Sequence, residues 1–349
     1  MARVESLLGC AAAARPLYAP TWVDRAEAAM RRGDVARADT LLGLASALWP
    51  ARPRLLWRTA LLRAERGNGA ESLRLLRAYL DATDVSQMDE PLLRVAAQAE
   101  PDASRRLHEL LPQDDPDRRA EEIRRILHVA LQSGDLPLAE PAWLEVPDDV
   151  RSGGEILDLY VEALLRQGET GRAIAAWRRH RSVATEPDAV TDGGFEEDPG
   201  QRGFRWRVRQ APGAVWARDA AVRHEGRHSL RIAFDGESDA GFQHVSQLVP
   251  LTPGAYRLQG FWRGRDLRPG AGPYVEAAAR GAPSRVSLPP RAGTWDWEPF
   301  AIEFRVQPGV AFVEVRLRRD AVASGLGLRG ELWLDDVDVQ RIPESRADG

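Results

Sequence analysis

The residue pairs of this sequence that could catalyse a reaction or bind a metal do not have the spacing that these roles require. Glu196-Glu197 and Asp335-Asp336 are adjacent carboxylates. Adjacent residues of a strand point to opposite faces, which argues against a glycosidase pair set about 5 Å or more apart across one cleft. His224 and His228 are four residues apart, but Gly226 places them in a loop, so they do not share a helix face as a pair of zinc ligands would.

Other catalytic motifs lack the neighbouring secondary structure or partner residues that they require. Gly325–Gly330 matches the letters of a dinucleotide-binding fingerprint, but it runs into the strand-like segment 331–334, where a phosphate-binding helix would have to begin. Cys10 is the sole cysteine and has no histidine partner in view. No serine lies in a nucleophile elbow. We therefore expect a protein that is not an enzyme.

Length and composition indicate a globular protein of more than one domain. The chain has 349 residues, of which 44% are hydrophobic and 29% charged, as in soluble proteins. All 48 basic residues are arginine, and the net charge is −4. Neither half is basic, which argues against nucleic-acid binding. No stretch approaches the roughly 18 apolar residues of a membrane span.

Four glycines indicate a repeat in the first half of the chain. Gly33, Gly67, Gly134 and Gly168 are separated by 34, 67 and 34 residues, which fits one period near 34 with one member missing. Each lies between two segments of helical periodicity. A fixed period of this length predicts an array of helix pairs over residues 19–185. The third pair, about residues 87–118, is degenerate, with short helices near 91–100 and 103–111.

The first pair resembles the tetratricopeptide repeat. Trp22 matches the early large residue of the first helix, Ala26 and Ala38 the small residues where the helices touch, and Pro50 the closing position. The resemblance implies about five repeats that stack into a superhelix with a concave groove. In that family the groove usually holds a protein or peptide, so a protein partner is expected here.

The pattern changes to period two after a linker at residues 186–191. Hydrophobic residues alternate with polar ones in the segments 230–234, 256–263 and 313–318, and turns such as Asp235-Gly236 separate such segments. Several short alternating strands with regular turns predict an antiparallel β-sandwich over residues 192–342, followed by a tail at 343–349. The expected fold is therefore multidomain α + β, a helical superhelix followed by a sandwich.

Five signatures in order give the second half a family resemblance. They are Asp192–Glu196, Gly226–Leu230, Gln247–Tyr256, Trp297 with Phe304 after it, and Leu332–Val337. This series resembles carbohydrate-binding modules with a jelly-roll, galactose-binding-like fold. The combination with helical repeats resembles proteins encoded beside bacterial exopolysaccharide or O-antigen polymerisation machinery.

This resemblance implies a glycan site. It makes Trp297 a core residue and Trp295, two residues earlier, an exposed platform for a sugar ring. Polar residues on the expected strands complete the candidate set, namely Gln243, Gln247, Gln259, Arg263 and Arg318. The alternative is a solvated outer face, as antiparallel sheets usually have. The sequence does not decide which face is concave, and a bulge near Asp335 would reverse the assignment.

The resemblance also implies a structural calcium ion near the first and last strands, although no cofactor is required. Glu196 and Asp335 match the expected ligands, with Asp192 and Asp336 near them. The alternative is that these carboxylates are surface charges or end a strand at solvent, since calcium takes six to eight oxygen ligands.

We expect a non-catalytic scaffold in bacterial envelope polysaccharide assembly or export, whose repeats bind a protein and whose sandwich binds a glycan. The alternatives are a protein scaffold whose sandwich binds no sugar and an accessory subunit of a carbohydrate-active enzyme. Localisation stays open between the envelope and the cytoplasm. In the N-terminal segment 1–18, Leu7–Cys10 resembles a lipoprotein cleavage site, but Glu5 interrupts the apolar stretch that a signal peptide needs.

Overall fold

The computed structural model describes residues 7, 10–50, 52–152, 154–181, 190–238, 241–268, 272–321 and 327–343. Most of the expected linker and the tail after residue 343 lie outside them. The chain divides into two compact units, residues 1–151 and 152–349. Each is described by itself below.

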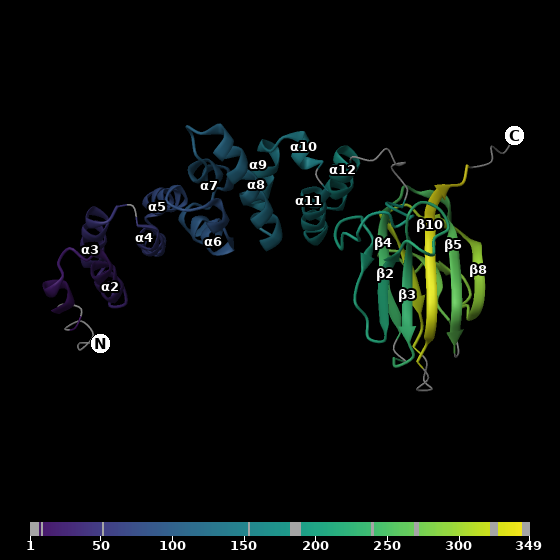
Figure 1. Cartoon of the computed structure of the whole chain (residues 1–349). Coiled ribbons are helices and arrows are strands. Elements are labelled where there is room, and N and C mark those ends of the chain that lie inside the picture. The colour runs from purple at the N-terminus through teal and green to yellow at the C-terminus, as the bar shows by residue number, and fades with distance from the viewer. Residues whose placement is uncertain are drawn as a thin grey trace, which may run out of the picture. The chain divides into compact units, whose positions relative to one another are not determined.

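The first unit is helical. Its elements are α2 (Ala19–Met30), α3 (Val35–Leu48), α4 (Pro53–Glu65), α5 (Gly69–Asp81), a 3₁₀ turn (Val85–Gln87), α6 (Glu90–Ala99), α7 (Ala103–Leu110), α8 (Pro116–Ser133), α9 (Leu136–Glu145) and α10 (Asp148–Arg151). The helices form consecutive pairs (Figure 1), as the glycine spacing predicts.

The turn glycines are required by backbone conformation rather than by space. Gly33, Gly67 and Gly134 have φ angles of 75°, 74° and 82°, and a Cβ atom added at any of them would meet nothing within 4 Å. Positive φ is the conformation that glycine adopts without steric cost. Asp side chains cap the helices that follow two of these turns, Asp34 at α3 and Asp135 at α9.

Small residues let paired helices approach closely. Ala26 and Ala38 are fully buried between α2 and α3, and Ser72 is buried where its hydroxyl donates to the carbonyl of Ala60 at 2.8 Å. The degenerate third pair forms at the expected place as α6 and α7, and the side chain of Asp102 caps α7. The sequence expectation for these helices is confirmed.

The second unit combines one helix pair with all the strands. Its elements are α11 (Gly154–Arg166), α12 (Thr170–His180), β1 (Arg207–Val208), β2 (Ala214–Asp219), β3 (Ser229–Asp235), β4 (Phe242–Pro250), β5 (Gly254–Arg268), β6 (Tyr274–Ala279), β7 (Arg285–Ser287), β8 (Gly293–Val306), β9 (Phe312–Arg319) and β10 (Arg329–Arg341).

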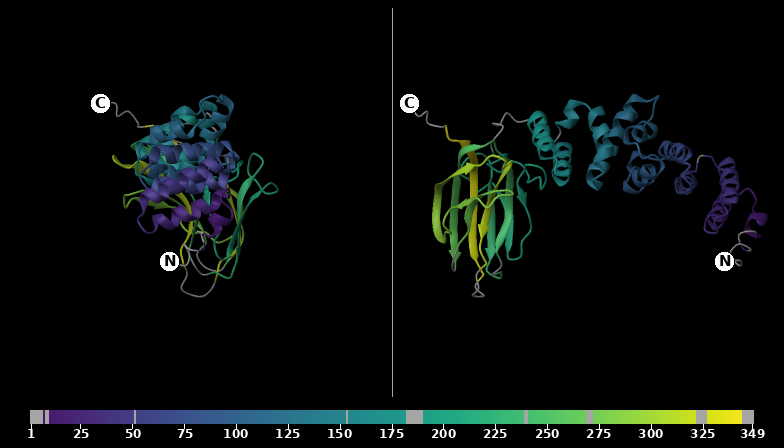
Figure 2. Two further views of the ribbon diagram at one scale, coloured as in Figure 1. Left: turned by 90° about the vertical axis from the view of Figure 1, so that its left-hand side faces the viewer. Right: turned by 180° about the vertical axis from the view of Figure 1, so that it is seen from behind.

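The strands form two five-stranded antiparallel sheets packed face to face. Sheet A has the order β1-β4-β9-β6-β7, and sheet B has the order β2-β3-β10-β5-β8. Figure 1 shows sheet B with β10 in the middle, and Figure 2 shows the sandwich from two further sides. The hydrophobic core lies between the sheets, with Leu230, Leu258 and Leu332 fully buried. The β-sandwich expected from the alternating pattern is confirmed.

A β-bulge in β8 places the two tryptophans of that strand on opposite faces of the sheet. In the ladder between β5 and β8, Trp262 pairs with Glu298 but Gly264 pairs with Trp295, so β8 has one residue more than β5 over this interval. Trp295 therefore points into the core and is only 7% exposed, whereas Trp297 is partly exposed. The expectation of an exposed Trp295 and a core Trp297 is wrong.

The α11–α12 pair belongs to the same compact unit as the sandwich, although its sequence pattern is that of the helical repeats. Trp177 of α12 packs edge to face against Phe204, at 5.6 Å between ring centroids. Asp158 of α11 is buried and lies 2.7 Å from Nε of Arg205. Burial raises the pKa of Asp158 to about 7, against the opposing effect of the Arg205 charge.

In the part of the chain that the structure describes, no helix has the length and hydrophobicity needed to cross a membrane.

Candidate functional site

The predicted glycan-binding residues do not form one site. Trp295 lies in the core. Gln247 is buried, and its side-chain amide makes two hydrogen bonds of 2.8 Å with the backbone of Thr191, which joins β4 to the start of the domain. Gln243 is exposed on β4. These three positions therefore face in different directions.

Arg318 lies on the outer face of sheet A in a closed charge network. Its guanidinium lies 3.5 Å from the carboxylate of Glu276, which also accepts a hydrogen bond of 2.5 Å from Arg316. Glu276 is only 2% exposed, although it pairs with Arg316 on the outward side of the sheet. Tyr274 donates to Asp320 at 2.8 Å beside this network. The charges of this face are paired with one another.

Gln259 and Arg263 are brought together on the outer face of sheet B. Both lie on β5 with two-residue spacing around Phe261, and all three pair with outward residues of β10. Gln259 is partly exposed, and no hydrogen-bond partner of its side chain is found among the described residues. Arg263 lies 3.5 Å from Asp296, whose side chain is 83% exposed. These are the two predicted residues that share a surface.

An aromatic cluster lies on the same face. The ring of His224 stacks on Phe261 with centroids 3.6 Å apart and an angle of 13° between the planes. Trp297 meets His224 edge to face at 5.8 Å. We call this surface the Trp297 face. It comprises His224, Gln259, Phe261, Arg263 and Trp297.

Sequence reasoning missed three members of the Trp297 face. The sequence indicates only a loop for His224, but that loop crosses sheet B and places Nδ1 of His224 2.7 Å from Asp336. The alternating pattern of residues 256–263 indicates a strand position for Phe261 and nothing more, and the family resemblance predicts a core position for Trp297. In the ladder between β5 and β8, Trp297 lies in the bulge, between the residues that pair with Trp262 and Gly264, and periodicity alone does not locate it there.

The expected calcium ligands gather around Gly194 but are occupied by N–H groups. Glu196 accepts from the backbone N–H of Arg227 at 2.5 Å, and Asp335 accepts from that of His224 at 2.8 Å. Backbone hydrogen bonds to the carboxylate of Glu196 lower its pKa to about 2. Burial raises the pKa of Asp335 to about 6.

The other two carboxylates are engaged in the same way. Asp192 accepts from the backbone N–H of Glu196 at 2.7 Å, and Asp336 faces His224. Over the described residues, no group of three or more His, Cys, Asp or Glu side chains is placed to hold a metal ion. A calcium ion needs free oxygen ligands, so these four carboxylates do not fit one as they are arranged.

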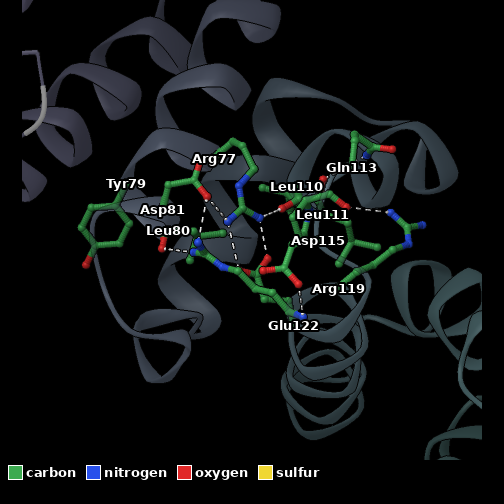
Figure 3. Close-up of polar contacts among 12 residues, drawn as sticks. Arg77, Tyr79, Leu80, Asp81, Leu110, Leu111, Gln113, Asp115, Arg119 and Glu122 are labelled. Carbon is green, nitrogen blue, oxygen red and sulfur yellow. Dashed lines mark hydrogen bonds and ion pairs between the residues drawn. The ribbon is translucent and has the colours of Figure 1, made fainter.

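In the helical unit, a hollow of about 450 Å³ lies beside a dense network of arginines. Arg77 of α5 is at its centre (Figure 3), where it bonds the carboxylate of Glu122 at 2.5 Å and that of Asp81 at 2.8 Å. Glu122 is 1% exposed and also accepts from Arg118 at 2.8 Å. Arg119 lies 2.5 Å from Glu145. These paired charges tie α5, α8 and α9 together, which is a structural role.

No protein-family model matches the chain, and no curated protein matches it in sequence. Three solved structures illustrate the similarity that is found. The structure of TmCBM61 in complex with beta-1,4-galactotriose has 18% identity, covers 45% of this chain and 97% of its own, and gives a TM-score of 0.29. A family 16 carbohydrate-binding module has 17% identity, 44% and 99% coverage, and a TM-score of 0.32. A cyclase from Fischerella sp. TAU has 14% identity, 45% and 96% coverage, and a TM-score of 0.30.

These similar structures include two binding modules and a catalytic protein. They assign no ligand to this chain.

Proposed function

We propose that this chain is a non-catalytic binding protein of two parts. The sandwich binds a glycan through the Trp297 face, and the helix pairs stack into a superhelix that binds a protein. The role we propose for the whole is in bacterial envelope polysaccharide assembly or export.

The observation that carries the glycan proposal is the partly exposed Trp297 beside uncommitted polar groups. Sugars bind proteins through aromatic surfaces that meet ring C–H groups and through planar polar side chains that meet hydroxyls. Among the described residues, neither the indole N–H of Trp297 nor the amide of Gln259 has a hydrogen-bond partner. Arg263 is on the same face. The outer face of sheet A is less suited, because its charges are already paired.

The test is affinity electrophoresis of the full chain in gels that contain neutral or acidic polysaccharides. We expect retention by at least one of them, loss of retention in Trp297→Ala and weaker retention in Gln259→Ala. Trp57→Ala is the matched control, because Trp57 is a partly exposed tryptophan of α4. Retention that survives Trp297→Ala would remove the face from the proposal, and no retention on any polysaccharide would favour a protein scaffold.

The non-catalytic part of the proposal has its own test. Chromogenic glycosides and esters should not be turned over by the full chain. Turnover that is lost on replacing His224 or Asp336, which lie 2.7 Å apart, would contradict it.

The protein-binding part rests on the regular helix pairs. In the first unit α2, α4, α6 and α8 contact one another in order, so each pair buries its apolar face against the next. Such a row exposes a long surface, which suits a protein segment better than a small molecule.

A further inference from the structure

A second surface, in the helical unit, combines aromatic rings with arginines. We call it the Tyr18 groove. It is a hollow of about 700 Å³, lined by the first turns of α2 and α4 and the end of α3. Tyr18 and Trp49 form its aromatic corner, with centroids 5.2 Å apart and planes at 88°. Tyr18 is 43% exposed, and Leu17 beside it is 73% exposed.

The groove carries positive charge that the described residues do not neutralise. Arg52 and Arg54 line it and are exposed, and neither makes an ion pair with any described residue. Arg58, at the edge, is already bonded to Asp24 at 2.7 Å and to Glu27. The described residues that line the groove include no aspartate or glutamate. This differs from the Arg77 network, where the carboxylates pair the arginines.

The helix ends add to this charge. Neither α2 nor α4 has a side-chain cap or an acidic residue in its first turn. Five other helices are capped by an Asp side chain, namely α3, α6, α7, α8 and α9. An uncapped helix N-terminus carries partial positive charge. The groove is therefore electrically complementary to an anionic ligand.

The geometry of the corner favours a peptide over an acidic sugar. The guanidinium of Arg52 lies 5.5 Å from the centroid of Trp49 and over its ring, and Tyr18 meets the same indole at a right angle. A sugar ring needs an open aromatic face. The Tyr18 hydroxyl and the Trp49 indole N–H have no hydrogen-bond partner among the described residues. Both can donate to backbone carbonyls, as in aromatic grooves that bind extended proline-rich segments.

We propose that the Tyr18 groove binds an acidic, proline-containing segment of a partner protein in an extended conformation. Its carboxylates pair with Arg52 and Arg54, and its prolines pack in the corner of Tyr18 and Trp49. This inference rests on the proposed protein-binding role of the helical unit and names the partner's chemistry and place.

The experiment is fluorescence anisotropy of the full chain with a labelled short peptide of alternating glutamate and proline. A glutamine–proline peptide and an oligogalacturonate are the comparison probes. We expect the glutamate peptide to bind, with affinity that falls as salt is added. Arg52→Gln and Arg54→Gln should each weaken binding by about tenfold or more, as for hydrogen bonds to charged groups. Arg74→Gln is the matched control, because Arg74 is exposed on α5 without a described ion pair.

Three results would overturn the inference. They are an absence of peptide binding to the unaltered chain, binding that the Arg52→Gln and Arg54→Gln changes leave intact, and binding of oligogalacturonate in place of the peptide. Glycan retention by the same variants should be unchanged. Peptide binding that survives both changes would exclude the groove as the site but would leave the protein-binding role of the helical unit standing. Loss of glycan retention in these variants, with peptide binding unchanged, would contradict only the proposal that the sandwich binds the glycan.

Discussion

Replacing Trp295 by alanine should cost the sandwich roughly 3 kcal/mol of its free energy of unfolding. A tryptophan buries about 150–250 Å², which at about 25 cal/mol per Å² corresponds to roughly 4–6 kcal/mol. The side chain packs over Gly264, where a Cβ atom would lie 2.3 Å from the ring. Its buried indole N–H has no partner in the described structure. Removing this unpaired donor offsets about 1–3 kcal/mol of the lost stability.

Trp297→Ala should cost less than about 1 kcal/mol, because Trp297 is partly exposed and lies outside the core. Trp295→Phe is the control. It keeps a ring against Gly264 and removes the unpaired N–H, so it should cost clearly less than alanine.

The assay is urea unfolding of the full chain and its variants, followed by far-UV circular dichroism, with the dependence on urea compared between variants. A larger loss of stability in Trp297→Ala than in Trp295→Ala would refute the bulge in β8 and the core position of Trp295 that depends on it.

Three further predictions concern stability. Gly193→Ala should destabilise the sandwich by about 2 kcal/mol or more, because its Cβ would lie 1.8 Å from the carbonyl oxygen of Val337, whereas Gly194→Ala meets nothing closer than 3.8 Å; thermal melting of the two variants compares them. Glu122→Gln should cost the helical unit about 3 kcal/mol in urea unfolding, since it leaves Arg77 and Arg118 with only the exposed carboxylate of Asp81 as an ion-pair partner; an unchanged midpoint would contradict the network. Burial raises the pKa of Asp158 to about 7, so its contribution to stability is present below the unfolded-state pKa near about 4 and is lost as the pH rises through about 7. Asp158→Asn should flatten this part of the pH profile of Tm, and a profile identical to the unaltered chain would show that another group titrates.

Local signals were enough to predict the helices. A turn glycine needs only its own φ, and Asp102 caps a helix whose first turn follows it directly. The strands were equally readable, because each alternates over its own few residues. The association of α11 and α12 with the sandwich was not, because it depends on side chains far apart in sequence such as Trp177 and Phe204.

The candidate site was harder to predict because bulges decide which face of the sheet each strand residue occupies. One extra residue in β8 places Trp295 and Trp297 on opposite faces, although residues two apart on a regular strand share one face. A second irregularity in β10, between Asp335 and Asp338, is the bulge that the sequence left open, and Asp336 there has a φ of 47°. Periodicity alone does not locate an extra residue. Of the predicted glycan-binding residues, only Gln259 and Arg263 therefore lie together on one surface, the outer face of sheet B.

The central claim is that the sandwich binds a glycan at the Trp297 face. Isothermal titration calorimetry, with an oligosaccharide cut from whichever polysaccharide retains the chain, tests it most directly. We predict one binding site in the unaltered chain and in Trp57→Ala, and no measurable heat in Trp297→Ala at the same concentrations. Equal binding by the unaltered chain and a folded Trp297→Ala variant, or no binding by either, would contradict the claim.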